Sequence, residues 1–412
     1  MEPIVKDNQY YKFCLYGFLK NLRFFDAFFI LFLLSKEINY GEIGILYALR
    51  EVTINLFEIP SGIVADTYGR KRALMGSFIF YIISFTIFYW GSHLLPYAIA
   101  FVFFGIAEAF RSGTHKGMIM EYLKQQHQQH QKIAYYGSTR SCSQTGSAIS
   151  ALLAGILVFF SGNYNYIFLF SIIPYLLNIL NIASYPKSLN FSTDSKTKKH
   201  REYSVKITFL NLIHTLKSAK TFRLINTSAL HSAYLKSVKD YVQPLMVAVI
   251  VMIPYLNHIE TSKKTGLFVG IFYFIIYYIS SIASRWASKA VNNKYNIVFI
   301  SLLLGLAAGL ISGIFYNFHL LVIALITFIA IYLIENLRKP ILTGYIADNV
   351  GNKVLTSVMS AQSQLKTIMV AVFSIVLGFL IQHLGMGTAM IILSASLILF
   401  GISIEYWPKK SK

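Results

Sequence analysis

Cysteine is scarce in this sequence, with 2 residues in a chain of 412. Cys14 and Cys142 both fall inside predicted helices, so neither a disulfide framework nor a thiolate metal site is expected. His127 and His130 stand close together in a glutamine-rich stretch, but a solvated loop is a better interpretation of that stretch than a metal site. We therefore expect no metal ion and no cofactor.

Charged residues are also scarce, and most of them are positive. Only 13% of the residues are charged, whereas 55% are hydrophobic and the mean hydropathy is +0.55. A soluble globular chain of this length would not normally combine these values, so we expect a protein embedded in the lipid bilayer. The net charge of +20 does not indicate a nucleic-acid partner, because the basic residues lie between apolar runs and not on one surface.

Other absences narrow the function further. The sequence shows no nucleophile accompanied by a base and no nucleotide-binding loop, so an enzyme is not expected. Residues 1–12 lack the short apolar region and small-residue cleavage site of a secretory signal, and the first apolar run is long enough to span a bilayer. We expect that run to remain as the first helix.

Long apolar runs predict an all-α membrane protein with twelve transmembrane helices. The expected spans are 13–34, 42–64, 73–92, 96–121, 133–160, 166–184, 222–252, 265–287, 296–316, 318–345, 355–383 and 386–406. Most Lys and Arg residues of the connecting segments fall on the side that carries both termini; the other side has only Lys36, Lys263 and Lys264. The positive-inside rule then predicts a multi-pass protein of the plasma (inner) membrane with both termini cytoplasmic.

A long polar connection at 185–221 divides six helices from six. We expect an N-terminal six-helix bundle at 1–184 and a C-terminal six-helix bundle at 222–412. Within the connection, apolar residues at helical spacing predict a helix on the cytoplasmic surface: Phe209, Leu212, Ile213 and Leu216.

A charged stretch between the second and third spans reads Gly-Ile-Val-Ala-Asp-Thr-Tyr-Gly-Arg-Lys-Arg from residue 62 to residue 72. With Leu74 it resembles the signature loop of the major facilitator superfamily, although any basic turn would also satisfy the positive-inside rule. The resemblance implies two six-helix bundles and a cytoplasmic gate. In that gate Asp66 would face a helix N-terminus of the second half and Arg70 would pair with Glu121, while Gly62 and Gly69 let the backbone turn tightly.

An internal repeat supports this assignment. The stretch Glu108-Ala-Phe-Arg111 and the residues after it align without gaps on Glu335-Asn-Leu-Arg338 and its continuation. Shorter matches relate the first span to the seventh, around Lys20 and Lys236, and the second span to the eighth. Six-helix halves of this kind place the substrate site between them, near the bilayer midplane.

Charged residues inside the spans form the candidate substrate site. A charge that faces lipid costs about 2.5 to 3.5 kcal/mol, so these residues are expected to be paired or to line a water-filled cavity. In the resembled family, helices 1, 4, 7 and 10 line that cavity. The candidates are Lys20, Arg23, Asp26, Glu108, Arg111, His115, Lys116, Arg140, Lys236, Lys239, Asp240, Glu335 and Arg338.

Bases outnumber acids in this set, which favours an anionic substrate because Arg binds carboxylate and phosphate in a fork. The alternative interpretation is structural ion pairing, Glu108 with Arg111 and Glu335 with Arg338. Asp26, Glu108 and Glu335 are the candidates for coupling to a proton, because burial and a basic neighbour shift a carboxyl pKa.

The sequence thus predicts a monomeric secondary transporter of a small anionic solute that works by alternating access, with export favoured over import. A multidrug/proton antiporter is an alternative, although His115 stands where those proteins have a glycine four residues after the arginine. A lipid flippase and a non-transporting sensor on the same fold are further alternatives.

Overall fold

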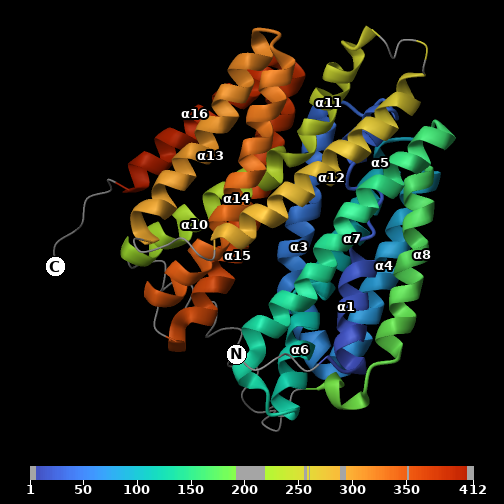
Figure 1. The fold of residues 1–412 in the computed structure, drawn as a ribbon, viewed down its shortest axis with the longest axis vertical. Coiled ribbons are helices and arrows are strands. Elements are labelled where there is room, and N and C mark those ends of the chain that lie inside the picture. Colours follow the sequence, from blue (N-terminus) through green and yellow to red (C-terminus); the bar gives the residue numbers. More distant parts are fainter. Residues whose placement is uncertain are drawn as a thin grey trace. The chain divides into compact units, whose positions relative to one another are not determined.

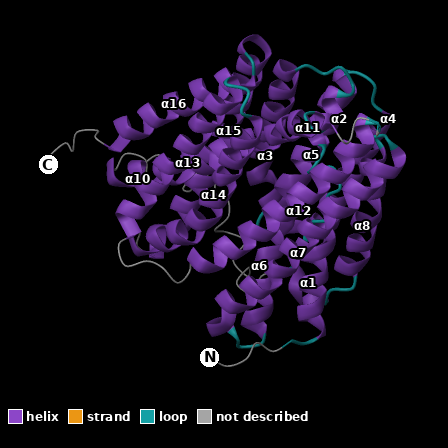
Figure 2. Cartoon of the chain, turned by 45° about the horizontal axis from the view of Figure 1, so that its top comes forward, coloured by secondary structure: helices purple, strands orange, loops and turns teal. Residues whose placement is uncertain are grey.

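The computed structural model describes residues 6–191, 219–254, 258, 260–287, 294–349 and 352–405. In these segments the chain forms helices joined by turns and contains no strand, which confirms the predicted all-α class (Figure 1 and Figure 2). The α-helices are α1 (Asn8–Lys20), α2 (Phe29–Leu34), α3 (Tyr40–Tyr68), α4 (Arg70–Trp90), α5 (Leu94–Arg111), α6 (Thr114–Gln125), α7 (Lys132–Ser161), α8 (Tyr166–Ala183), α10 (Ala219–Val238), α11 (Val242–Val251), α12 (Thr261–Ala287), α13 (Lys294–Asn317), α14 (Leu321–Asn349), α15 (Asn352–Leu384) and α16 (Met386–Glu405).

Each of the twelve predicted spans corresponds to one helix or to a pair of consecutive helices. By length and composition alone, 8 stretches within the described residues could cross a membrane: α4, α5 with α6, most of α7, α8, and most or all of α13, α14, α15 and α16. The other four spans are α1 with α2, α3, α10 with α11, and α12. α1, α2 and α11 are too short to cross a membrane alone, and α3 contains charges such as Arg50, Glu51 and Glu58, which lower its mean hydropathy.

Two of the interruptions occur at positions that the internal repeat aligns. The first predicted span stops being helical after Lys20, whereas in the seventh the α-helix ends at Val238 and a 3-10 turn over Lys239–Tyr241 leads directly into α11. At the end of α1, the exposed carbonyl groups find side-chain donors: Tyr175 Oη donates to Lys20 O at 3.2 Å and Asn21 Nδ2 donates to Gly17 O at 3.0 Å. Interrupted helices at matching positions of two repeats are a pointer to a transport site.

The described chain forms two compact units, and each can be described by itself. The first contains Met1–Lys36, Val52–Lys199 and Pro254–Tyr277; the second contains Glu37–Glu51, His200–Ile253 and Tyr278–Lys412. In the first unit α1 packs on α7 and α8, and α4 packs on α5 and α8. In the second unit α13 packs on α14 and α16, and α10 packs on α15.

The predicted boundaries of the two bundles at 184 and 222 stay a prediction. Most of the connection 185–221, including its expected surface helix, lies outside the described residues.

Glycines allow the closest helix crossings in both units. In the second unit a Cβ atom on Gly44 of α3 would come within 2.4 Å of the Ser374 carbonyl oxygen of α15. In the first unit a Cβ atom on Gly155 of α7 would come within 2.7 Å of the Gly266 carbonyl oxygen of α12. Since backbone lies against backbone at both places, only a residue without a side chain fits.

An aromatic core holds the first unit together beyond the end of α1. Phe168 of α8 stacks on Phe88 of α4 at 4.8 Å and on Phe25 at 5.7 Å between ring centroids. Rings of this size contribute a large buried apolar area and specific ring geometry. The core therefore fixes α4 and α8 around the segment that joins α1 to α2.

Candidate functional site

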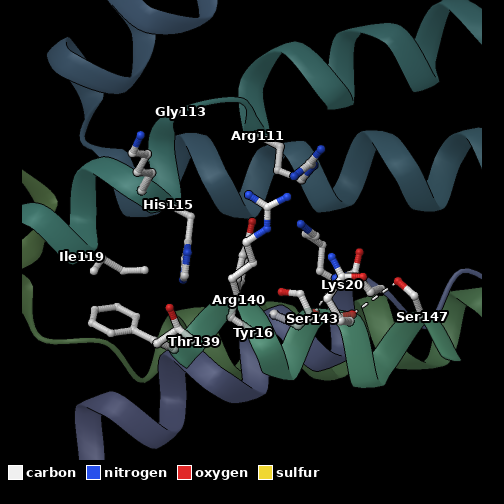
Figure 3. Close-up of a pocket in the computed structure, with 15 residues that line it drawn as sticks. Tyr16, Lys20, Arg111, Gly113, His115, Ile119, Thr139, Arg140, Ser143 and Ser147 are labelled. Carbon is white, nitrogen blue, oxygen red and sulfur yellow. Dashed lines mark hydrogen bonds between the residues drawn. The ribbon is translucent and has the colours of Figure 1, made fainter. Parts of the chain in front are cut away.

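A cavity of about 370 Å³ lies in the first unit, among α1, α5, α6 and α7. Its volume is in the usual range for sites that bind small molecules. The side chains and backbone around it, drawn in Figure 3, belong to Phe13, Tyr16, Gly17, Lys20, Asn21, Arg111, Gly113, His115, Lys116, Ile119, Thr139, Arg140, Ser143, Gln144 and Ser147.

The charges on the cavity wall are all positive. Lys20, Arg111, Lys116 and Arg140 line it, and none of its lining residues in the described chain is Asp or Glu. Figure 3 shows the side chains of Lys20, Arg111 and Arg140 turned toward the same space. Within the described residues, Lys20 and Arg140 have neither a hydrogen-bond partner nor an ion-pair partner. An anion that entered would meet two cations that form no ion pair in the described chain.

Arg111 is held in place by groups behind the cavity wall. Glu108, one turn earlier on α5, forms an ion pair with Arg111 and a second one with Arg23 at 3.2 Å. Tyr81 of α4 donates to the same carboxylate and accepts from Arg111 Nε at 3.2 Å. Of the two ion pairs that the alternative interpretation named, the one between Glu108 and Arg111 is therefore formed. Asp26 lies just beyond, close enough to Arg23 to interact with it electrostatically.

His115 lies flat against the ring of Tyr16, with 3.6 Å between ring centroids. Its Nε2 atom is 3.3 Å from the hydroxyl of Tyr185, which donates to Lys12 O at 3.2 Å. Tyr185 lies beyond the end of α8, and burial raises the pKa of its hydroxyl well above the ordinary value. Because this hydroxyl keeps its proton and gives it to Lys12 O, it accepts from His115, whose Nε2 carries the hydrogen.

Polar side chains of α7 form the wall opposite Arg111. Thr139, Ser143 and Ser147 follow one another at intervals of four residues and therefore share one face of the helix. Ser147 Oγ donates to the Ser143 carbonyl oxygen at 3.3 Å, the dashed contact in Figure 3. Gln144 and Asn21 add amide groups to the same cavity.

The candidate residues of α10 and the turn after it lie in the second unit, where acids neutralise them. Lys236 Nζ is 2.6 Å from Glu51, whose fully buried carboxylate is also 3.1 Å from Arg50. Lys239 Nζ is 3.3 Å from Asp240, and Asp240 accepts a hydrogen bond from Tyr47 at 3.1 Å. Each cation of this cluster thus pairs with an acid at 3.3 Å or less, unlike Lys20 and Arg140 of the cavity.

The second pair of the alternative interpretation, between Glu335 and Arg338, is not formed in the described structure. Glu335 accepts from His231 at 2.7 Å and from Ser232. Arg338 is only 1% exposed and donates to the carbonyl groups of Thr227 and Val298. The hydrogen-bond donors to the carboxylate come from α10, and the acceptors of the guanidinium are backbone carbonyl groups.

The candidate gate lies at the junction of α3 and α4. α3 continues to Tyr68 and α4 begins at Arg70, so Gly69 alone separates two helices where the sequence suggested a loop. Arg70 Nη1 donates to the Gly117 carbonyl oxygen at 3.1 Å and forms no ion pair with Glu121 in the described part of the chain. Glu121 is buried one turn further along α6, while Gly62 and Asp66 are exposed on α3.

Replacing Gly69 by alanine is expected to destabilise the protein by about 1 to 3 kcal/mol, because its φ of 101° is a conformation that essentially only glycine adopts. A Cβ atom there would also come within 2.3 Å of the Asn190 side chain. Thermal unfolding of the purified protein in detergent measures the effect. Gly76→Ala is the control, since Gly76 is helical with nothing within 4 Å of its Cβ position; equal midpoints for both variants would contradict the assignment.

Some residues of the site gave no signal in the sequence. Tyr81 and Tyr175 orient Arg111 and Arg23, but they are two of 28 tyrosines. The hydroxyl row of α7 could have been found, because its spacing of four in an apolar helix is visible in the sequence. Among the described residues, no group of three or more His, Cys, Asp or Glu side chains could hold a metal ion.

Comparison with known proteins identifies the family of the chain. Residues 15–372 match the family model described as Major Facilitator Superfamily. The chain is 31% identical over 90 residues to a Bacillus subtilis (strain 168) protein described as the uncharacterized MFS-type transporter YxaM. That match spans 22% of this chain and only 23% of the relative.

Solved structures similar to the chain are transporters by their descriptions. The nucleoside transporter NupG has a TM-score of 0.71 at 12% identity, covering 97% of both chains. A POT family transporter in complex with 5-aminolevulinic acid has a TM-score of 0.69 at 13% identity, covering 96% of this chain and 94% of that one. The inward-open xylose transporter XylE from E. coli has a TM-score of 0.66 at 13% identity, covering 98% and 96%. At these identities the similarity shows the fold.

Proposed function

Because the chain belongs to the major facilitator superfamily, we propose that it is a secondary active transporter that moves a small organic anion by alternating access. It is a multi-pass membrane protein; its distribution of Lys and Arg supports an inner-membrane location with both termini in the cytoplasm. The similar transporters carry substrates as different as nucleosides and xylose, so the choice of substrate class rests on the cavity.

One observation carries the proposal of an anion. Lys20 and Arg140 face the cavity of the first unit without an ion-pair partner in the described chain, and Arg111 shares its carboxylate partner with Arg23. Cations inside a membrane protein are costly and mark substrate or ion pathways. A bound anion would supply the missing negative charge, and release of the anion would leave the site ready for another cycle.

Binding of anions is expected to raise the thermal midpoint of the purified protein in detergent, since a ligand at a hundred times its dissociation constant stabilises by about 2.7 kcal/mol. A panel of carboxylates, phosphates, lipophilic cations and lysolipids tests the ligand class. Lys20→Gln and Arg140→Gln each remove a charged donor worth about 1.5 to 3 kcal/mol, so binding should weaken roughly tenfold or more.

Lys187→Gln is the matched control, because Lys187 is an exposed lysine of the same unit outside the cavity. Stabilisation by lipophilic cations alone would overturn the proposal in favour of a multidrug antiporter. Lysolipids that bind more tightly than their water-soluble head groups would indicate a flippase. Anion binding without flux into proteoliposomes would indicate a sensor.

Proton coupling and direction are part of the same proposal. Glu108 pairs with Arg111 of the cavity wall, Asp26 interacts with Arg23, and Glu335 contacts His231 in the second unit, so these carboxylates are the candidates to exchange a proton during the cycle. We favour export by a monomer, with Asp66, Gly69 and Arg70 at the cytoplasmic gate. Flux driven by a pH gradient across proteoliposomes, in both orientations of the gradient, measures coupling and direction together.

A further inference from the structure

The excess charge of the first unit is concentrated in one interacting group. Lys20 interacts electrostatically with three arginines and one glutamate, and one of those arginines also interacts with an aspartate. The group contains Lys20, Arg23, Arg111, Arg140, Glu108 and Asp26. Even without Lys116, four cations face two carboxylates, which leaves a deficit of two negative charges. A monoanion would remove only half of that deficit.

The cations of three helices meet at one place on the cavity wall. Figure 3 shows the heads of Lys20, Arg111 and Arg140 turned toward one another from α1, α5 and α7. A dicarboxylate divides its two charges between groups separated by carbon atoms, so only one of them could lie at this point. A phosphomonoester carries about −1.5 to −2 charges and three acceptor oxygens on a single head group. Two arginine forks and an ammonium group can bind those oxygens together.

The rest of the cavity suits a polar molecular body. The row of Thr139, Ser143 and Ser147 offers hydroxyl groups along α7, and Asn21 and Gln144 offer amides. Such groups exchange hydrogen bonds with the hydroxyls of a ligand. Among the lining side chains of the described chain, only Phe13, Tyr16 and Ile119 are large and hydrophobic, which is a poor lining for an acyl chain.

We propose that the cavity binds a phosphomonoester of a small hydroxyl-bearing molecule, with the phosphate between Lys20, Arg111 and Arg140 and the body along the hydroxyl row of α7. This inference rests on the proposed function and deepens it, because it specifies which anion the transporter takes. It predicts discrimination by charge on one head group, which a general anion carrier would lack.

Binding of matched sugar esters to the purified full-length protein tests the proposal. Glucose 6-phosphate and glucose 6-sulfate share their body and differ in having two negative charges or one. Calorimetry at about pH 7.5 should show the phosphate binding at least about tenfold more tightly than the sulfate. Lowering the pH to about 5.5 should weaken the binding of glucose 6-phosphate, because the second pKa of its phosphate is near 6. The affinity for glucose 6-sulfate should stay unchanged.

Further ligands and variants separate the outcomes. Binding of glucose measures the contribution of the hydroxyl-bearing body without a charged head group. Binding of succinate measures the effect of two negative charges on separate groups. Both ligands should bind more weakly than glucose 6-phosphate. Lys20→Gln should reduce the preference for phosphate over sulfate, and Lys187→Gln should keep it. Lysophosphatidic acid that bound more tightly than glycerol 3-phosphate would assign the phosphate site to a lipid head group and overturn the hydroxyl-bearing body.

Equal affinity for the two esters, or failure of every phosphomonoester to bind, would overturn the inference. The proposed function would survive that result if succinate or a monocarboxylate bound and lost affinity in Lys20→Gln and Arg140→Gln. It would fail as well only if no anion bound or if only cations did. The two proposals therefore fail on different results, and the comparison of the two esters needs only the wild-type protein.

Discussion

Replacing Glu335 by leucine is expected to lower the free energy of unfolding by about 3 to 5 kcal/mol, the usual effect of removing one partner from a buried ionic cluster. The carboxylate accepts hydrogen bonds from His231 and Ser232 and interacts electrostatically with Arg338. Arg338 and His231 are fully enclosed in the second unit. Without the acid, the guanidinium would be a buried charge with only carbonyl partners.

The thermal midpoint of the purified protein in detergent measures this effect, and Glu335→Gln separates charge from shape. Glutamine keeps the size of the side chain and can still hydrogen bond, so a loss close to that of leucine would assign the effect to the charge. Glu260→Gln is the control: Glu260 pairs with Lys263 at 3.3 Å, and both side chains are largely exposed. Screening by water makes such a pair weak, so its removal should leave the midpoint unchanged. A Glu335→Leu protein with the wild-type midpoint would contradict the stabilising role of this buried cluster.

Gly44→Leu is expected to prevent the second unit from packing, at a cost of about 3 kcal/mol or more. A Cβ atom at Gly44 would lie 2.4 Å from a backbone oxygen of α15 and 3.2 Å from the Cα atom of Gly378. No change of rotamer relieves a clash with backbone, so α3 and α15 would have to separate along their length.

Size-exclusion profiles and thermal unfolding in detergent check this prediction. Gly76→Leu places the same side chain on a helix where nothing lies within 4 Å of the Cβ position, and it should give folded protein. Gly155→Leu should also prevent correct packing, because backbone atoms of Gly266 and Gly270 of α12 lie against the Cβ position of Gly155. A Gly44→Leu protein with the wild-type midpoint would show that this crossing tolerates separation.

The sequence by itself determined the fold class, the spans and the family. Apolar runs and their charged ends are local properties that the bilayer selects for, so they can be read without knowledge of contacts. The motif around Asp66 and Arg70 and the repeat of Glu108 and Glu335 are likewise local patterns. They were sufficient to predict a transporter and to identify the residues that form the charged wall of the cavity, Lys20, Arg111 and Arg140 among them.

Only the tertiary structure decided which of those charges are compensated. Lys236 meets Glu51 and Arg23 meets Glu108, pairs that lie 185 and 85 residues apart in the chain. Arg338, although aligned with Arg111 in the repeat, is enclosed by carbonyl groups, whereas Arg111 lines a cavity. A charge costs the same to bury wherever it stands in the sequence, and its compensation depends on side chains that only folding brings near. The pairing of charges, and with it the location of the proposed anion site, is therefore a property of the fold.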